Sequence, residues 1–475
     1  MSANAAASGT WDHPKGLSTL FFTEMWERFS YYGMRAILIL FMVAPLENGG
    51  LGFDTQKAAT IYGLYTGGVY LMAIPGGFIA DRLLGLRNAV LVGGILIALG
   101  HYSLAFQGPS TTFFGGLILI VLGTGLLKPN ISSIVGQLYS ENDPRRDAGF
   151  SIFYMGINLG AFISPFVCGY LGQRVGWHWG FGAAGVGMTL GLVQYLLGRG
   201  RLGSAGLLRE PPENAGKLWL LVASGLVGLV AVMFLAGDYR DHVILLAALG
   251  LFAWLLLKVA ETVFERKRIA AIILLFVFAT LFWAGFEQAG SSLTLFADRL
   301  TDNRLFGWEF PSSWYQSVEP LFVITLAPLF AWLWIALGPR QPSSPGKFAI
   351  ALGLLSVSFF MMAFASSLNL QTETKVSPFW LIVVYFLHAL GELSLSPVGL
   401  STVTKLAPER ILGLLMGVWF LSNALGNYTA GSVAGFFDRL PLPQLFGAVG
   451  LTSLAATIVL ALLVKPIRNL MSGVN

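Results

Sequence analysis

Residues 24–35 read EMWERFSYYGMR and lie within an apolar segment, 17–43, that is long enough to cross a lipid bilayer. Several of their polar side chains are spaced at i, i+3, i+4 and i+7, which places them on one helical face. These residues are Glu24, Glu27, Arg28 and Tyr31, and Arg35 continues the face by one turn. Charged groups at membrane depth are costly unless they meet a partner or a wet cavity, so they usually serve a function. The alternative is an internal salt bridge that only locks a helix bundle.

The composition is that of a polytopic membrane protein. Of the 475 residues, 55% are hydrophobic and 11% are charged, whereas a soluble domain carries about 25% charged residues. The formal net charge of +5 does not indicate nucleic-acid binding, because the basic residues lie in short loops rather than in one stripe. The single cysteine, Cys168, excludes an intramolecular disulfide.

Fourteen apolar runs are long enough to be membrane-spanning helices. They fall at residues 17–43, 55–80, 88–106, 112–138, 148–172, 177–198, 218–236, 243–263, 269–297, 313–337, 347–366, 378–405, 411–435 and 441–464. Lys and Arg are in excess in the segments that are cytoplasmic when both termini lie inside, which agrees with the positive-inside rule. Two halves of six crossings suggest a pseudo-symmetric transporter with its site between the halves at mid-membrane.

The opening stretch also resembles a family signature. Residues 24–33, EMWERFSYYG, are similar to the ExxERFxYYG motif of proton-coupled oligopeptide transporters, a branch of the major facilitator superfamily. Residues 76–87, GGFIADRLLGLR, resemble the superfamily's loop motif between its second and third helices, and residues 153–160, FYMGINLG, are also similar to the family. The resemblance extends along nearly the whole chain.

The resemblance implies an all-α membrane protein with the major facilitator fold, in which two extra helices of bacterial members separate two six-helix bundles. It also implies a bacterial inner membrane as the location, with both termini cytoplasmic. The two extra runs look like passive lipid-facing helices. The expected parts of the chain are a mobile N-terminus at 1–16, a first bundle at 17–198, a linker with two additional transmembrane helices at 199–268, a second bundle at 269–465 and a C-terminal tail at 466–475.

The intramembrane charges divide between the two halves. The first half holds all the bases and two acids: Arg28, Arg35, Lys128, Glu24 and Glu27. The second half holds only acids: Glu287, Glu319 and Glu392. If these side chains face one cavity, it is positive on one wall and negative on the other, which suits a zwitterion. A di- or tripeptide spans roughly 7–11 Å and fits such opposed walls.

The candidate substrate-binding residues are charged, amide and aromatic: Arg28, Tyr32, Arg35, Tyr70, Lys128, Asn158, Trp283, Glu392 and Trp419. Each has a structural alternative. Lys128 could snorkel to the membrane surface, although it lies about eleven residues from the cytoplasmic end of its helix. Asn158 could bond another helix instead of substrate, and aromatic residues more often serve packing or interface anchoring. The resemblance places Lys128 in the substrate cavity.

Proton coupling is predicted from the surplus of acids. Five intramembrane acids face three bases, so at least one acid should be able to carry a proton, because burial disfavours its charged form. The candidates for proton coupling are Glu24, Glu27, Arg28 and Glu287. Glu287 is also a candidate partner for Arg35.

Glu319 departs from the family pattern, because relatives are expected to carry Asn at this position. It precedes Pro320 in the first turns of its predicted helix, where a carboxylate suits the positive end of the helix dipole. We therefore expect a local role for Glu319 and not a role as the ammonium ligand.

Other classes of protein lack their signatures. The chain has no His-Glu-x-x-His, Gly-x-Ser-x-Gly or P-loop motif, so we expect no enzyme activity, no metal and no cofactor. No nucleotide-binding domain suggests an ATP-driven pump, and a channel would not need opposed charged walls. The prediction is a monomeric proton-coupled symporter in the lipid bilayer that imports di- and tripeptides by alternating access. The alternative is a proton-coupled carrier of another small anion or zwitterion, such as nitrate or an amino acid.

Overall fold

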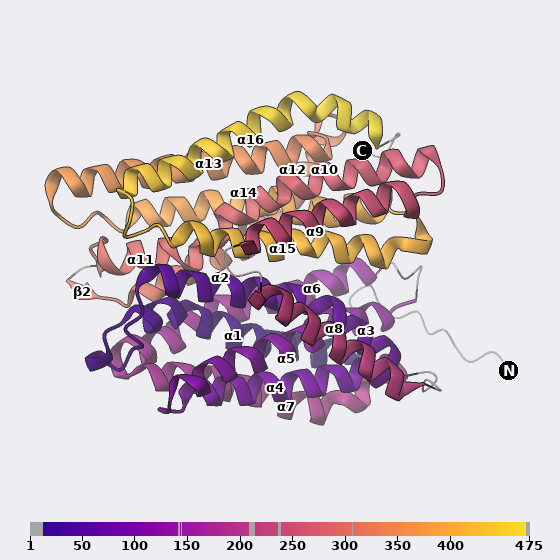
Figure 1. Cartoon of the computed structure of the whole chain (residues 1–475), viewed down its shortest axis with the longest axis horizontal. Coiled ribbons are helices and arrows are strands. Elements are labelled where there is room, and N and C mark those ends of the chain that lie inside the picture. The colour runs from indigo at the N-terminus through magenta and orange to yellow at the C-terminus, as the bar shows by residue number, and fades with distance from the viewer. Residues whose placement is uncertain are drawn as a thin grey trace. The chain divides into compact units, whose positions relative to one another are not determined.

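The computed structural model describes residues 13–140, 143, 145–208, 214–235, 239–305 and 307–471 (Figure 1). Nearly all of these residues are in helices or in short connections between them. Two short strands, β1 (Arg304–Leu305) and β2 (Trp308–Glu309), pair in antiparallel fashion. Most of the predicted mobile N-terminus, residues 1–12, lies outside the described residues.

Fourteen helical segments of the described residues can be membrane spans, which confirms the all-helical membrane fold expected from the sequence. Eleven qualify by length and apolar composition. The other three are α1 (Gly16–Val43), α8 (Ala215–Leu235) and α15 (Leu412–Ala434), with 28, 21 and 23 residues. Of these, α1 carries the charged stretch 24–35.

The chain divides into two compact units, and each unit includes a segment from the other half of the sequence. Unit 1 comprises Met1–Gly52, Met72–Pro212 and Pro311–Ile324, and unit 2 comprises Phe53–Leu71, Glu213–Phe310 and Thr325–Asn475. The second predicted crossing is therefore shared, because its first part packs in unit 2 and the rest in unit 1. Sequence order alone would have assigned it to the first bundle.

Besides α1, unit 1 contains α3 (Ala73–Ile79), α4 (Leu86–Ala105), α5 (Ser110–Gln137), α6 (Arg146–Ser164) and α7 (Trp177–Gly198). These helices run alongside one another, with α6 and α7 packed against α1 and with α5 packed against α4 (Figure 1). Unit 2 contains α8, α15 and the remaining long helices, which are α2 (Thr55–Leu71), α9 (Arg240–Trp254), α10 (Val263–Phe286), α11 (Ser292–Arg299), α13 (Ser344–Thr372), α14 (Phe379–Leu406) and α16 (Leu442–Leu470). α12 (Val318–Leu337) begins in unit 1 and continues into unit 2.

Short turns extend several of these helices. The 3-10 turns are Leu46–Asn48, Arg199–Leu202, Glu287–Gly290, Ser312–Ser317, Gly338–Arg340 and Glu409–Ile411. The π-helical turns are Ala80–Leu84, Pro165–Gly169, Leu171–Val175 and Leu255–Val259. At the C-terminal end, α16 continues to Leu470, past the predicted end of the last crossing at 464.

Prolines explain the end of α2 and a missing backbone hydrogen bond within α5. α2 ends at Leu71 because Pro75, four residues on, has no N–H to donate to the Leu71 carbonyl. α5 continues through Pro129, whose ring removes the same kind of bond to Gly125. α3 approaches α5 there, since a Cβ added to Gly76 would lie 2.0 Å from the Gly125 carbonyl oxygen. Close approach at small residues is typical of membrane helices.

In unit 2, glycines bring α2 and α15 into direct backbone contact. A Cβ added to Gly63 of α2 would lie 2.9 Å from the Cα of Gly431, and one added to Gly67 would lie 2.9 Å from the Ala424 carbonyl oxygen. No larger side chain fits at these points without a shift of the helices. α13 and α16 form another long contact of this unit.

Candidate functional site

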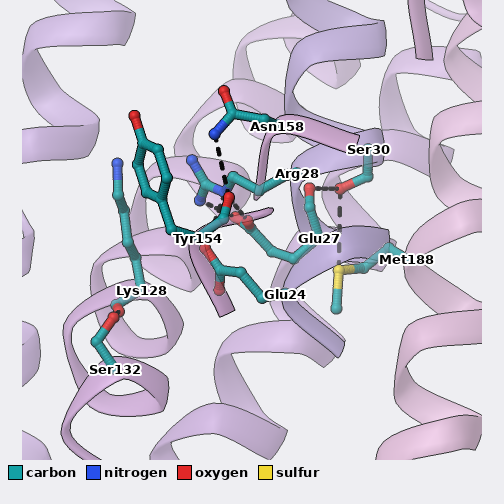
Figure 2. Close-up of polar contacts among 9 residues, drawn as sticks. All are labelled: Glu24, Glu27, Arg28, Ser30, Lys128, Ser132, Tyr154, Asn158 and Met188. Atoms are coloured by element: carbon teal, nitrogen blue, oxygen red, sulfur yellow. Dashed lines mark hydrogen bonds and ion pairs between the residues drawn. The ribbon is translucent and has the colours of Figure 1, made fainter. Parts of the chain in front are cut away.

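Three buried charged side chains of α1 form the centre of the candidate site (Figure 2). Glu24, Glu27 and Arg28 are 1%, 0% and 1% exposed. The Arg28 guanidinium makes a fork with Glu27, in which Nε donates to Oε2 and Nη2 donates to Oε1 at 2.6 Å. Arg28 Nε also lies 3.3 Å from Glu24 Oε1. The helical spacing read from the sequence thus produces one ion-pair cluster.

The cluster holds one positive and two negative groups when both acids are ionised. Lys128 adds an electrostatic interaction with Glu24. Glu24 Oε2 is buried and has no hydrogen-bond partner among the described residues. An incompletely compensated buried charge is costly, and a proton on one carboxyl group removes it. The cluster is therefore suited to hold a proton, and a proton there weakens the pairing of Arg28.

Neighbouring helices hold the backbone of this cluster closely. A Cβ added to Gly160 of α6 would lie 2.3 Å from the Met25 carbonyl oxygen, and one added to Gly187 of α7 would lie 2.5 Å from Phe29 Cδ1. Ser30 Oγ donates to the carbonyl oxygen of Glu27 at 2.8 Å (Figure 2). These contacts fix the turn of α1 that carries the charges, so a change in pairing must come from the side chains.

Lys128 of α5 and Asn158 of α6 lie near the cluster in Figure 2. Lys128 is half-buried, and Asn158 is 8% exposed. Asn158 Nδ2 donates to the Tyr154 carbonyl oxygen at 3.1 Å, within its own helix. One amide hydrogen is therefore used locally, and this bond sets the direction in which the amide points.

Aromatic rings accompany the two arginines of α1. Arg28 Cζ lies 5.1 Å from the centroid of the Tyr31 ring and 6.0 Å from that of Tyr32. Arg35 Cζ lies 6.0 Å from the centroid of the same Tyr32 ring. Cation–π contacts contribute about 0.5–2 kcal/mol, more when they are desolvated. Tyr32 therefore contacts both of the arginines predicted to bind a carboxylate.

The predicted residues of unit 2 come from four helices and one turn. Tyr70 is on α2, Trp283 is in the last turn of α10, Glu287 begins the 3-10 turn after α10, Glu392 is on α14 and Trp419 is on α15. Glu287 is 3% exposed, and Glu392 is half-buried. A Cβ added to Gly426 of α15 would lie 2.3 Å from Trp283 Cβ, so α15 crosses α10 at this tryptophan. Trp419 packs against Phe348, with 6.0 Å between ring centroids.

Glu319 lies in unit 1, although its place in the sequence groups it with the acids of the second half. Residues 311–324 pack in that unit. The Ser313 N–H donates to Gln173 Oε1 at 3.0 Å, and the rings of Phe166 and Trp314 lie 4.9 Å apart. Glu319 is in the first turn of α12, where the sequence placed it. The remaining candidates of unit 1 are Glu24, Glu27, Arg28, Tyr32, Arg35, Lys128 and Asn158.

Two sets of polar contacts in unit 2 were not foreseen from the sequence. Asp438 accepts hydrogen bonds from the Thr55 hydroxyl and, at 2.9 Å, from Arg299 Nη1. The Tyr428 hydroxyl of α15 donates to Asp241 Oδ1 of α9 at 2.7 Å. The first turn of the inserted helix α9 is therefore bonded to α15, while only 6% of its apolar span is buried, as expected for a lipid-facing helix. No local sequence signal joins these partners, because they are far apart in the chain.

Comparisons with known proteins agree along nearly the whole chain. A model of the POT family matches residues 87–449. Peptide transporter YePEPT of Yersinia enterocolitica subsp. palearctica is 42% identical over 97% of this chain and 96% of that protein. The di-/tripeptide transporter of Lactococcus lactis subsp. cremoris is 39% identical over 97% of each chain. A crystal structure of a mutant of the peptide transporter POT in complex with alafosfalin contains a chain that is 43% identical, with a TM-score of 0.89 over 98% of this chain and 97% of that chain. The likeness confirms the expected fold class, the major facilitator fold.

Proposed function

Because this chain belongs to the POT family, we propose that it is a proton-coupled symporter that imports di- and tripeptides. The observation that carries the proposal is the buried cluster of Glu24, Glu27 and Arg28, which can exchange a proton for an ion pair. Two relatives named as peptide transporters support the substrate class. The chain belongs to a family of transporters and is a multi-pass membrane protein.

We assign the two ends of the peptide by charge. The peptide carboxylate binds to the basic side chains of unit 1, because guanidinium groups bind carboxylates through paired hydrogen bonds. The residues for this end are Arg28, Arg35 and Lys128, with Tyr32 and Asn158 beside them. The peptide ammonium group binds to Glu392 of unit 2. Tyr70, Trp283 and Trp419 provide contacts for the peptide's side chains.

Proton coupling is assigned to the α1 cluster, with Glu287 as a second proton site. A proton on Glu27 or Glu24 weakens the fork and releases Arg28 to bind the peptide carboxylate. Loss of the proton on the other side of the membrane restores the pair and expels the peptide. The driving free energy for one proton is about 2.3 kcal/mol per 100 mV and about 1.4 kcal/mol per pH unit.

Proteoliposomes separate this proposal from its alternative. With an inward proton gradient, labelled dialanine should accumulate, and dissipation of the gradient by a protonophore should abolish the accumulation. Labelled nitrate and labelled alanine serve as the other substrates in the same vesicles. Accumulation of nitrate or alanine without dialanine would replace the peptide assignment by a carrier of another anion or zwitterion.

The use of both peptide termini is tested by competition. Unmodified dialanine, N-acetylated dialanine and C-amidated dialanine are compared as inhibitors of labelled dialanine uptake. The unmodified peptide should inhibit most, because each modification removes one of the two charges. The N-acetylated form should gain nothing from Glu392, and the amidated form should gain nothing from Lys128. Equal inhibition by all three compounds would contradict the assignment.

The location and organisation complete the proposal. We place the protein in a bacterial inner membrane as a monomer, with both termini cytoplasmic and with the bundles 17–198 and 269–465 as the two halves of an alternating-access carrier. The linker 199–268 carries the additional pair of helices. A Lys15→Cys variant in a Cys168→Ser background should react with a membrane-impermeant thiol reagent only from the cytoplasmic side. Labelling of intact cells from outside would reverse the orientation.

A further inference from the structure

A buried histidine lies one helical turn before Glu392 on α14. His388 is 0% exposed and plays no part in the function proposed above. Three aromatic rings surround its imidazole, with centroid distances of 5.5, 5.9 and 6.1 Å to Phe286, Phe359 and Tyr385. Phe286 directly precedes Glu287. The histidine thus contacts the residue that precedes Glu287 and lies one helical turn from Glu392.

Ser358 of α13 determines which nitrogen of His388 carries the proton. Ser358 Oγ donates to the Leu355 carbonyl oxygen at 2.7 Å, and a hydroxyl group has only one hydrogen. The same Oγ lies 3.0 Å from His388 Nε2, so in this contact Nε2–H donates and Oγ accepts. Neutral His388 therefore carries its proton on Nε2 and presents a lone pair on Nδ1.

The Nδ1 lone pair lacks a donor. His388 Nδ1 is buried and has no hydrogen-bond partner among the described residues. A buried acceptor without a donor destabilises the state that contains it. The arrangement therefore favours any state of the protein in which a neighbouring group supplies an O–H or N–H to this nitrogen.

Glu392 is placed to supply that hydrogen. It lies four residues after His388, so both are on one face of α14. Side chains of a helix lean toward its N-terminus, which directs Glu392 back over the turn that carries His388. An ionised carboxylate can only accept a hydrogen bond, whereas a protonated carboxyl group can donate one. Nδ1 therefore distinguishes the two protonation states of Glu392.

Few other ionisable groups of unit 2 face this position. α10 contributes Glu287 just after its end, and its charged residues 265–268 lie at its opposite end. α13 carries Lys347 in its first turn, about three turns before Ser358. α15 has Tyr428 as its ionisable residue. On α14 itself, the Tyr385 hydroxyl donates to the Ala289 carbonyl oxygen at 3.4 Å.

We propose that His388 is a positioning residue for Glu392, whose protonated carboxyl group donates a hydrogen bond to His388 Nδ1. The inference rests on the proposed function, because it needs a peptide ammonium at Glu392. The ammonium and the proton compete for the same carboxylate. When the peptide binds, the proton leaves Glu392 for water and the bond to Nδ1 is lost. Protonation of Glu392 therefore opposes the gain in affinity that protonation of the α1 cluster provides, and His388 sets the pH at which this loss of affinity begins.

The test compares two substitutions at this position. His388→Phe removes the acceptor and keeps a ring of similar size, whereas His388→Gln keeps an amide that can donate to Ser358 and accept from Glu392. KM and kcat for dialanine are measured across the pH range in proteoliposomes. The wild-type KM should pass through a minimum and rise again on its acidic side, where Glu392 takes up a proton. In His388→Phe this rise should begin about 0.5–1 pH unit lower, which is the equivalent of one hydrogen bond. kcat should be unchanged, and His388→Gln should restore the wild-type profile.

A second buried histidine provides the matched control. His101 of α4 is 0% exposed, and neither of its ring nitrogens has a hydrogen-bond partner among the described residues. α4 contains no acid, so His101→Phe should leave the KM profile unchanged. N-acetylated dialanine has no ammonium group, and its weaker uptake should not show the acid rise in KM. A profile for folded His388→Phe that coincides with wild type would overturn the inference.

Spectroscopy gives a readout that does not depend on uptake. In protein labelled with 15N-histidine, the Nδ1 resonance of His388 should show an unprotonated, hydrogen-bonded nitrogen in acid and should shift when saturating dialanine is added. An Nδ1 resonance that is insensitive to both acid and dialanine would also overturn the inference, even if His388→Phe fails to fold. Failure of wild-type protein to take up dialanine would instead refute the proposed function.

Discussion

Glu27→Gln tests the assignment of proton coupling to the α1 cluster. Glutamine has the shape of a protonated glutamate but cannot exchange a proton. Arg28 donates two hydrogen bonds to the Glu27 carboxylate. The substitution keeps one acceptor, the side-chain carbonyl oxygen, and replaces the other by an NH2 group that cannot accept. The variant should therefore hold Arg28 in its released state, bind dialanine and exchange it across the membrane. It should not accumulate dialanine in response to a proton gradient.

The expected magnitudes follow from the contacts. Loss of one hydrogen bond between charged groups costs about 1.5–3 kcal/mol of stability. Arg28 keeps Glu24 at 3.3 Å, so the larger cost of about 3–5 kcal/mol for a stranded buried charge does not apply. For one proton per peptide, 100 mV and one pH unit supply about 3.7 kcal/mol, which corresponds to about 500-fold accumulation. The accumulation ratio of the variant should be near one.

The assay uses one preparation of vesicles in two modes. The first imposes a membrane potential and a pH step and measures the internal concentration of labelled dialanine. The second preloads the vesicles with unlabelled dialanine and measures counterflow without a gradient. Thermal unfolding of the purified variant shows that it is folded. Gradient-driven accumulation at the wild-type level by folded Glu27→Gln would refute the reasoning, and the role would pass to Glu24 or Glu287.

Three further predictions concern packing, specificity and surface charge. Gly160→Ala should lower stability by about 1–3 kcal/mol in thermal unfolding, because its Cβ would meet the Met25 carbonyl oxygen, whereas Gly115→Ala, where a Cβ meets nothing within 4 Å, should be neutral. Glu319→Asn should keep dialanine uptake within a few-fold, and complete loss in folded protein would place Glu319 in the substrate site. Hydrogen bonds from Arg145 lower the pKa of Asp143 from 3.8 to about 2, so this contact should stabilise the protein fully above pH 3.8 and be lost as the pH falls through about 2. In Arg145→Ala, the midpoint of Asp143 in a 13C NMR titration should move up toward 3.8.

The sequence predicts what depends on local spacing. The i, i+3, i+4 pattern of Glu24, Glu27 and Arg28 places three side chains on one turn of helix, and such neighbours meet whatever surrounds them. The fourteen apolar runs likewise determine the helical spans, because each span satisfies its own backbone hydrogen bonds. Pro75 lies within the second predicted crossing. The end of α2 at Leu71 follows only when one notes that Pro75 has no N–H for the Leu71 carbonyl.

Contacts between distant segments could not be predicted in this way. The bond between Asp241 and Tyr428 depends on how an inserted helix docks, and neither residue carries a mark of its partner. The same holds for His388, which reads as an ordinary residue of an apolar helix until Ser358 is placed beside it. Packing likewise decides that Glu319 belongs to unit 1, and the order of charges along the chain does not reveal this.

The exchange of segments between the two units has a consequence for biogenesis. Unit 1 needs residues 311–324, so it remains incomplete until the ribosome has synthesised most of the chain. Unit 2 needs residues 53–71, which have been inserted in the membrane long before the rest of that unit emerges. During synthesis α2 is therefore in the bilayer before α15 exists. The side of α2 that carries Gly63 and Gly67 is not yet covered by α15. A chain truncated after the first six crossings would lack α15, which covers this face in the whole chain.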